Sequence, residues 1–210
     1  RFHHDIKVDV ELSEAMQRSA EEAGIVSMMM RNPDFRVDYG TIVSCHMMNP
    51  DWDKPIVTIS SNRSTHYYSD EVMNEQASAL GRAVSKAIEE SGKKVVLVAS
   101  HSLSHRHFVT EAPLPEDMSR EHIYNHSQYV WDMKVIEMMR EGKMKEVIEI
   151  LPEMIEQTMA EAEGGGLTWM MAAMGMPDYP AEIYGYQSVI GTGNVIAAWD
   201  PNSATRALVL

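Results

Sequence analysis

Three histidines stand close together after a strongly apolar segment, and their side chains could move protons or bind a metal ion. They are His101, His105 and His107, in the polar segment 100–107 that follows the apolar run 94–99. Imidazole changes its charge near neutral pH and is the commonest metal ligand among side chains. The carboxyl end of a buried strand in an open α/β sheet is also where ligands bind. The sequence therefore predicts an acid/base or metal site here, with a solvated polar loop as the alternative.

One glutamate falls on the apolar side of a predicted helical stretch. At 100° per residue, the apolar side chains of residues 143–163 share one side with Glu161, whereas the other glutamates point to the opposite side or its borders. A carboxylate on a core-facing side is costly unless a metal ion, a cation or a proton compensates for its charge. Glu161 is therefore a candidate metal ligand. The alternative is a side chain that reaches solvent beside the glycines 164–166.

A third segment could position a substrate through the phenol of Tyr39 and the hydroxyl of Thr41. The same residues could instead begin the next helix, with Asp38 as its N-cap, and on chemistry alone the cap is the preferred interpretation. The glycine-rich triplet 191–193 is too short for a dinucleotide fingerprint and predicts a turn or bulge.

The elements that must position these residues alternate between helices and strands. Helices are predicted over residues 9–23, 39–48, 69–90, 119–141, 143–150, 152–163 and 167–174. Strands are predicted over residues 25–30, 56–59 and 94–99, with a pair of short strands over 184–199. Such alternation, with nearly continuous apolar strands, is typical of an α/β sheet covered on both faces. We expect a single α/β domain over residues 1–210, with a central mixed sheet flanked by helices on both faces.

Composition excludes several classes of function. The chain has 210 residues and a formal net charge of −13, which argues against nucleic acid or an anionic membrane as a partner. No apolar run approaches the roughly 20 residues that a membrane-spanning helix needs. Cys45 is the single cysteine, so an internal disulfide is impossible and a cytoplasmic location is expected.

Several specific strings of residues are spread along the chain. They are Arg31-Asn32-Pro33, Phe35-Arg36-Val37-Asp38-Tyr39-Gly40-Thr41, Leu103-Ser104-His105, His107-Phe108, Pro115-Glu116-Asp117-Met118-Ser119, Trp131-Asp132, Thr168-Trp169-Met170 and Val189-Ile190-Gly191-Thr192-Gly193-Asn194. In these strings the chain resembles the class III extradiol ring-cleavage dioxygenases. The likeness covers essentially all 210 residues.

The resemblance implies a non-haem Fe(II) enzyme whose metal is held by two histidines and one carboxylate, with positions open for substrate and dioxygen. The family's carboxylate ligand matches Glu161, and its acid/base histidine matches His105. Its substrate-contacting tyrosine matches Tyr39, which favours the substrate interpretation of that segment, and Thr41 is a further expected contact. The implied reaction opens the ring of 2-aminophenol or a catechol-like substrate with O2 and gives a muconic semialdehyde.

The family's two histidine ligands lie on early strands, upstream of the position that matches Arg1. His3 and His4 match neither ligand motif. We therefore expect an N-terminal portion, with the first strands of the sheet and both histidine ligands, to be missing from this sequence.

The implied partners are a small aromatic substrate, O2 and a related subunit in a hetero- or homo-oligomer. One alternative is a non-catalytic partner subunit, although retention of both His105 and Glu161 argues against it. A second alternative is a metal-dependent hydrolase that uses His101, His105, His107 and Glu161.

Overall fold

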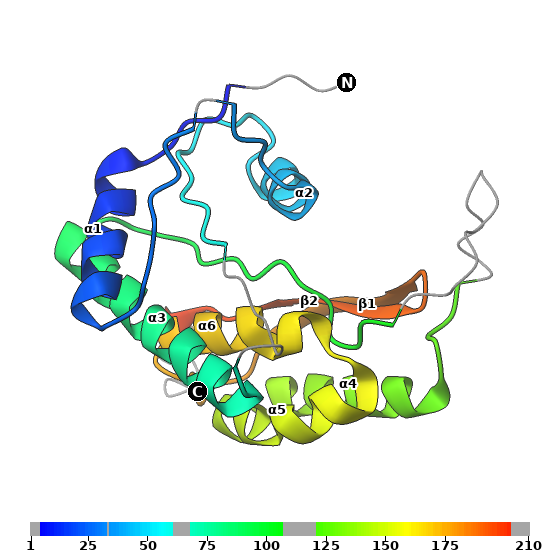
Figure 1. Cartoon of the computed structure of the whole chain (residues 1–210). Coiled ribbons are helices and arrows are strands. Elements are labelled where there is room, and N and C mark those ends of the chain that lie inside the picture. Colours follow the sequence, from blue (N-terminus) through cyan, green and yellow to red (C-terminus); the bar gives the residue numbers. More distant parts are fainter. Residues whose placement is uncertain (1–4, 33, 61–67, 107–120, 203–210) are drawn as a thin grey trace.

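The computed structural model describes residues 5–32, 34–60, 68–106 and 121–202. His107 lies outside these ranges, so one of the three clustered histidines has no structural account. The described chain combines α and β structure and is rich in helix (Figure 1). Its elements are α1 (Val10–Glu22), α2 (Tyr39–Met48), α3 (Asp70–Ser91), α4 (His126–Arg140), α5 (Met144–Thr158), the 3-10 turn η2 (Glu161–Gly164), α6 (Gly165–Ala173), β1 (Glu182–Val189) and β2 (Thr192–Ala198).

The predicted bounds of the first three helices are confirmed to within a residue or two, because local capping residues determine where these helices begin. Asp9, Asp38 and Ser69 are the N-caps of α1, α2 and α3, and each side chain accepts a backbone N–H from three residues further on. Gly92 ends α3 in the left-handed region at φ 64°, where a side chain would be strained. No helix among the described residues is long and apolar enough to cross a membrane.

The two helices predicted over 143–150 and 152–163 are wrong in their bounds. A single helix, α5, runs through Pro152 and ends at Thr158. Met159 then turns into the left-handed region at φ 53°, so the chain leaves the helix before it reaches Glu161. Glu161 begins η2, and the helical periodicity used to orient it therefore does not apply.

The central mixed sheet flanked by helices on both faces is not confirmed by the described residues. The segments 25–30, 56–59 and 94–99 form no regular strand, and one parallel bridge joins Val8 to Ile56. Apolar side chains on these segments are exposed, with Val26 at 100% and Val96 at 81%. An apolar, β-branched run becomes a buried strand only where neighbouring strands take up its backbone hydrogen bonds.

The regular sheet that the structure describes is the C-terminal hairpin, as predicted for residues 184–199. β1 and β2 are antiparallel, with Glu182 opposite Ala198 and Val189 opposite Thr192. The turn at Ile190 and Gly191 joins them, and both of these residues have positive φ. The hairpin packs against α4.

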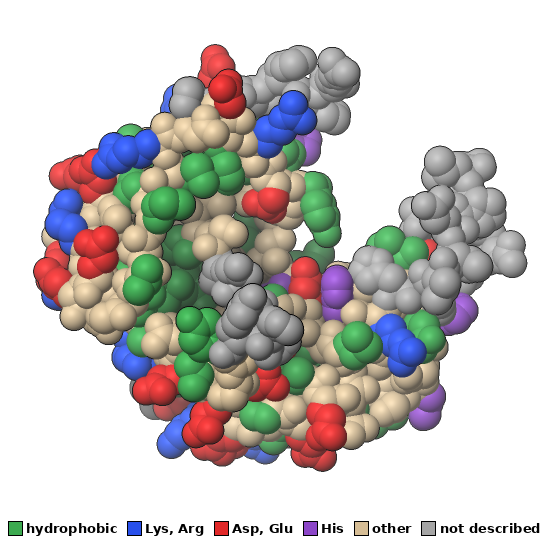
Figure 2. Space-filling view, in the orientation of Figure 1, with side chains coloured by type: hydrophobic (Ala, Val, Ile, Leu, Met, Phe, Trp, Pro, Cys, Tyr) green, Lys and Arg blue, Asp and Glu red, His purple; other side chains and the backbone are tan. Residues whose placement is uncertain are grey.

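The main core lies between α4, α5 and α6. Its most buried members, none more than 1% exposed, are Val135, Ile136, Met139, Met144, Val147, Met154 and Met171. A smaller core joins α1 to α3, and α3 in turn packs on α6. Figure 1 shows α2 set apart from this body, and Figure 2 shows a hollow between the two, with acidic and histidine side chains at its floor.

Candidate functional site

The structure brings His105 and Glu161 together from segments far apart in the sequence. The Nε2 atom of His105 lies 3.9 Å from Oε1 of Glu161. Their side chains are 33% and 28% exposed, so both are half-buried yet open to a small molecule. The imidazole can act as a general acid or base, and the carboxylate is a good ligand for a divalent cation.

Glu161 stands in a strained stretch of backbone. Met159, Ala162 and Glu163 all adopt left-handed conformations, at φ 53°, 45° and 52°. Residues with a β-carbon occupy this region at a cost of order 1 kcal/mol each and persist only where the surroundings impose it. The strain turns the chain sharply on both sides of Glu161.

Hydrogen bonds tie this turn to the histidine loop, residues 101–105. The backbone N–H of Ser102 donates to Oε2 of Glu161 in a short contact, which leaves Oε1 directed at His105. The backbone N–H of Glu161 donates to the carbonyl oxygen of Leu103 at 3.3 Å, and that of His105 donates to the carbonyl oxygen of Thr158 at 3.4 Å. The loop and η2 therefore fix each other's backbone.

A buried carboxylate, Asp132, is also hydrogen-bonded to the histidine loop. It is 0% exposed and accepts three hydrogen bonds: from the backbone N–H of Ser104 (3.0 Å), from the Ser104 hydroxyl (2.7 Å) and from the Tyr186 hydroxyl (2.7 Å). Burial raises the pKa of Asp132, and the three donors act in the opposite direction. Burial, with the bond to Asp132, also raises the pKa of Tyr186 well above its usual range.

His101 belongs to the same cluster. Its ring is half-buried, and Nδ1 lies 2.7 Å from the carbonyl oxygen of Ser102. Burial lowers the pKa of His101, and the nearby His105 lowers it further. The hydrogen bond to Ser102 and the negative charge of Glu161 act in the opposite direction. A neutral imidazole is therefore favoured at this position.

The predicted substrate residues Tyr39 and Thr41 lie in the first turn of α2. The N–H and hydroxyl of Thr41 both donate to the Asp38 carboxylate, at 2.9 and 2.8 Å, so the capping interpretation of this segment holds. Tyr39 is 81% exposed. The carbonyl oxygen of Gly40 accepts a hydrogen bond from Ser100, the residue before the histidine loop, so the first turn of α2 borders that loop.

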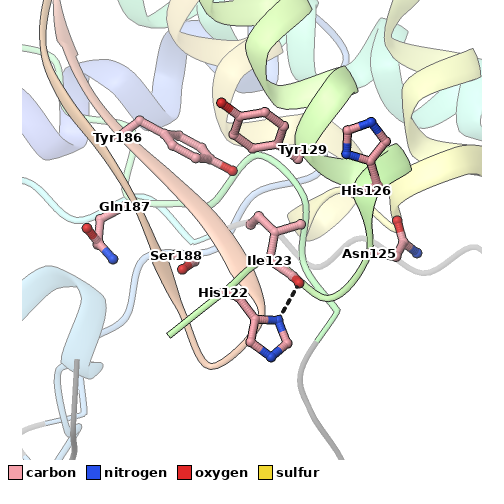
Figure 3. A pocket seen from close by; sticks show the side chains of 8 residues that line it. All are labelled: His122, Ile123, Asn125, His126, Tyr129, Tyr186, Gln187 and Ser188. Carbon is pink, nitrogen blue, oxygen red and sulfur yellow. Dashed lines mark hydrogen bonds between the residues drawn. The ribbon is translucent and has the colours of Figure 1, made fainter. Parts of the chain in front are cut away.

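A second depression, of about 430 Å³, opens beside the hairpin (Figure 3). Its lining comes from the chain before α4, from α4 itself and from β1: His122, Ile123, Asn125, His126, Tyr129, Tyr186, Gln187 and Ser188. The rings of Tyr129 and Tyr186 meet edge to face at 6.2 Å. Tyr186 thus has its ring in this pocket and its hydroxyl on Asp132, beneath the histidine loop.

The described residues do not by themselves make up a metal site. Among them, no group of three or more His, Cys, Asp or Glu side chains could hold a metal ion. Glu161 offers one carboxylate oxygen that is free of the contact with Ser102. The donors present thus fit a single carboxylate ligand and do not make up a complete set.

Comparison with known proteins gives a consistent result. Residues 1–198 match the family model described as the catalytic LigB subunit of aromatic ring-opening dioxygenase. The chain is 50% identical over 209 residues to the 2-aminophenol 1,6-dioxygenase beta subunit of a Pseudomonas species, covering 100% of this chain and 68% of that protein.

Two more distant relatives carry related names. The 3,4-dihydroxyphenylacetate 2,3-dioxygenase of Escherichia coli is 27% identical over 174 residues, covering 83% of this chain and 60% of its own length. The 2-aminophenol 1,6-dioxygenase alpha subunit of a Pseudomonas species is 25% identical over 194 residues, covering 92% of this chain and 68% of that protein. The chain therefore spans about two thirds of the length of these relatives.

Proposed function

The chain belongs to the family of the catalytic LigB subunit of aromatic ring-opening dioxygenases, and from this premise we propose that its substrate is 2-aminophenol or a catechol-like ring. Two carbons of such a ring carry adjacent hydroxyl and amino groups, or two hydroxyl groups. Ring opening beside them inserts both atoms of O2 and gives a muconic semialdehyde. The observation that carries the proposal is the 3.9 Å pairing of His105 with Glu161 in a chain that matches this family.

The comparisons also bear on the two alternative functions. Identity to the beta subunit is 50%, against 25% to the alpha subunit, which favours the catalytic subunit over a non-catalytic partner. The family is one of dioxygenases, so the metal-dependent hydrolase finds no support. The paired subunit names support assembly with a related subunit, and we propose a hetero-oligomer in the cytoplasm.

His105 is proposed as the acid/base residue. Its side chain is partly exposed and its Nε2 atom lies 3.9 Å from Glu161, so it can accept a proton from the hydroxyl of a substrate bound beside the carboxylate. The same nitrogen then returns that proton to oxygen as the O–O bond breaks. Burial lowers the pKa of His101 and favours its neutral form, so we assign the acid/base role to His105, whose Nε2 atom lies beside Glu161.

Glu161 is proposed as the carboxylate ligand of Fe(II). The bond from the Ser102 N–H fixes one of its oxygens, so the carboxylate cannot rotate away from the site. In this proposal two histidines complete the ligand set. When bound, the iron supplies a centre at which the adjacent substrate groups and dioxygen are held side by side.

Tyr39 and Thr41 are proposed to contact the substrate from the α2 side. The exposed phenol of Tyr39 can donate a hydrogen bond to a ring substituent or pack against the ring. The hydroxyl proton of Thr41 is engaged with Asp38, so its oxygen is available only as an acceptor, which suits an amino or hydroxyl donor on the substrate.

Oxygen uptake during substrate loss tests the proposed reaction. We expect the purified, iron-loaded enzyme to consume one O2 for each 2-aminophenol or catechol that disappears. The ring absorbance should fall while the absorbance of a semialdehyde rises. Substrate loss without oxygen uptake would point to hydrolysis, and no loss of either compound would remove these substrates from consideration.

Metal content tests the role of Glu161. We expect Glu161→Ala to lose bound iron, measured per chain by elemental analysis, while Glu156→Ala keeps it because Glu156 is exposed on α5. Full iron occupancy in Glu161→Ala would refute the ligand assignment.

A further inference from the structure

Asp132 is a buried carboxylate that the proposed reaction does not use. It lies on α4 and is 0% exposed, yet none of its partners is a cation. An ionised group in such a place is costly, and protein interiors keep one only where several donors surround it. Its three donors come from just two residues, Ser104 in the histidine loop and Tyr186 in β1.

The arrangement joins the histidine loop to the hairpin. Both polar groups of Ser104 that can donate, the backbone N–H and the hydroxyl, point to Asp132, and the next residue is His105. On the same side, Gly193 in β2 donates its N–H to the carbonyl oxygen of Ser104 at 3.0 Å and accepts the N–H of Leu103 at 2.8 Å. The hydrogen-bonding groups around Ser104 are thus fixed to α4 and β2.

Close packing leaves Asp132 no room to move. A β-carbon on Gly193 would lie 1.8 Å from Oδ2 of Asp132 and 2.8 Å from the Ser104 hydroxyl oxygen. Glycine is therefore required at this position for the carboxylate to reach the loop. Tyr186 closes the other side with its hydroxyl at 2.7 Å.

We infer that Asp132, held by Tyr186, is a positioning residue that sets the orientation of His105 toward the substrate. The inference rests on the proposed acid/base role of His105. Asp132 is fully buried and binds Ser104, the neighbour of His105 in the chain, so it acts on His105 through Ser104. A side chain that must hand over a proton loses about 100-fold in rate when it is misplaced by roughly 1 Å.

A double-mutant cycle separates this role from a merely structural one. Asp132→Asn keeps the shape of the side chain but replaces an oxygen that accepts two hydroxyl donors with an amide that donates. We expect it to lower kcat per bound iron by about 10-fold, with KM and iron content unchanged, because the loop shifts while the metal ligand stays. In a His105→Ala background, the same substitution should lower kcat by less than about 3-fold, since the residue it orients is gone.

A pair of tyrosines on one strand provides a matched second measurement. Tyr186 and Tyr184 both lie on β1, and both donate their hydroxyl to a carboxylate, but the partner of Tyr184 is the exposed Glu182, at 2.9 Å. We expect Tyr186→Phe to lower kcat by about 3-fold to 10-fold, whereas Tyr184→Phe stays at the wild-type value. Each substitution removes one phenol hydroxyl, but only the hydroxyl of Tyr186 is hydrogen-bonded to Asp132.

The outcomes distinguish the inference from the function on which it rests. The positioning role would be overturned if Asp132→Asn lowered kcat by the same factor in the wild-type and His105→Ala backgrounds. It would also be overturned if Tyr186→Phe and Tyr184→Phe were equally active. Both conclusions hold even if His105→Ala itself has very low activity. Turnover near wild type in His105→Ala would overturn the acid/base role itself. A small effect of Asp132→Asn in the wild-type background, under about 3-fold, also contradicts the inference.

Discussion

The histidine loop and the first turn of α2 are both expected to carry site residues, yet they are built in opposite ways. The loop, residues 101–105, is bound on several sides by the buried Asp132, by η2 and by β2. α2 has no buried residue, and its apolar side chains Ile42, Val43 and Met47 are exposed. The groups proposed to move a proton and to bind a metal are thus held by many hydrogen bonds, whereas the side expected to meet the ring of the substrate is open.

This difference has a physical meaning for catalysis. Proton transfer and metal binding need geometry held within about 0.5 Å, which only a packed and fully hydrogen-bonded surrounding provides. Contact with the face of a ring tolerates more freedom, because it depends on apolar area and few directed bonds. Substitutions in the two regions should therefore differ in what they change: stability and kcat in the first, KM in the second.

The largest expected contrast in stability is between truncating a buried apolar side chain, Leu151, and truncating an exposed one, Val43. The Leu151 side chain packs under η2, where a β-carbon on Gly164 would lie 3.0 Å from its Cδ1 atom. Leu151→Ala should lower the free energy of unfolding by about 3–5 kcal/mol through the cavity it leaves. Val43→Ala on α2, where Val43 is 53% exposed, should change it by less than about 0.5 kcal/mol. Denaturant titration measures both, and a large loss in Val43→Ala would show that α2 is covered in solution.

A glycine pair on the hairpin sharpens the comparison within the packed region. Gly193→Ala should lower the free energy of unfolding by about 2–3 kcal/mol, because its β-carbon would collide with Asp132. A β-carbon on Gly185, in the same hairpin, meets nothing within 4 Å, so Gly185→Ala should be close to neutral. Equal stability of the two variants in the same titration would mean that Asp132 is not held against β2.

The open side is tested by Tyr39→Phe. Loss of one hydrogen bond to the substrate should raise KM by about 3-fold to 10-fold, with kcat and the thermal midpoint unchanged. Steady-state oxygen uptake gives both constants, and Tyr184→Phe serves as the control for loss of a surface hydroxyl. A fall in kcat with constant KM would instead place Tyr39 in the rigid part of the site.

The smallest expected effect concerns the cap of α2. The hydrogen bond from the Thr41 N–H lowers the pKa of Asp38, so the folded state favours the carboxylate. The stability that this adds is present above the unfolded pKa of about 3.9 and is lost as pH falls through the lower folded value. Asp38→Ala should therefore cost about 1 kcal/mol at pH 7 and less near pH 3. Thermal unfolding at the two pH values checks this, and a cost that does not diminish in acid would contradict it.

Local signals explain what the sequence predicted well. α1, α2 and α3 begin at Asp9, Asp38 and Ser69, whose capping roles depend only on residues three positions away. The hairpin is likewise marked by the triplet 191–193 between two short predicted strands. Such features can be read without knowing what packs against them.

Features that depend on distant partners were harder to predict. Helical periodicity selects Glu161, although the left-handed Met159 ends the helix before it, and what fixes the carboxylate is Ser102. Asp132 stood within a string that resembled the family, but its role depends on Ser104 and Tyr186, which no local pattern connects to it. The local signal at Asp132 is an acid with an apolar residue on either side, Trp131 and Met133.

The most direct test of the account is the turnover of His105→Ala with its iron content measured in the same preparation. We predict iron per chain equal to wild type and kcat lower by about 100-fold to 10,000-fold, the usual contribution of a general acid/base residue. His126→Ala, an exposed histidine on α4, is the matched control and should keep wild-type turnover. Turnover of His105→Ala near the wild-type value, with iron retained, would contradict the central claim that His105 moves the proton during ring opening.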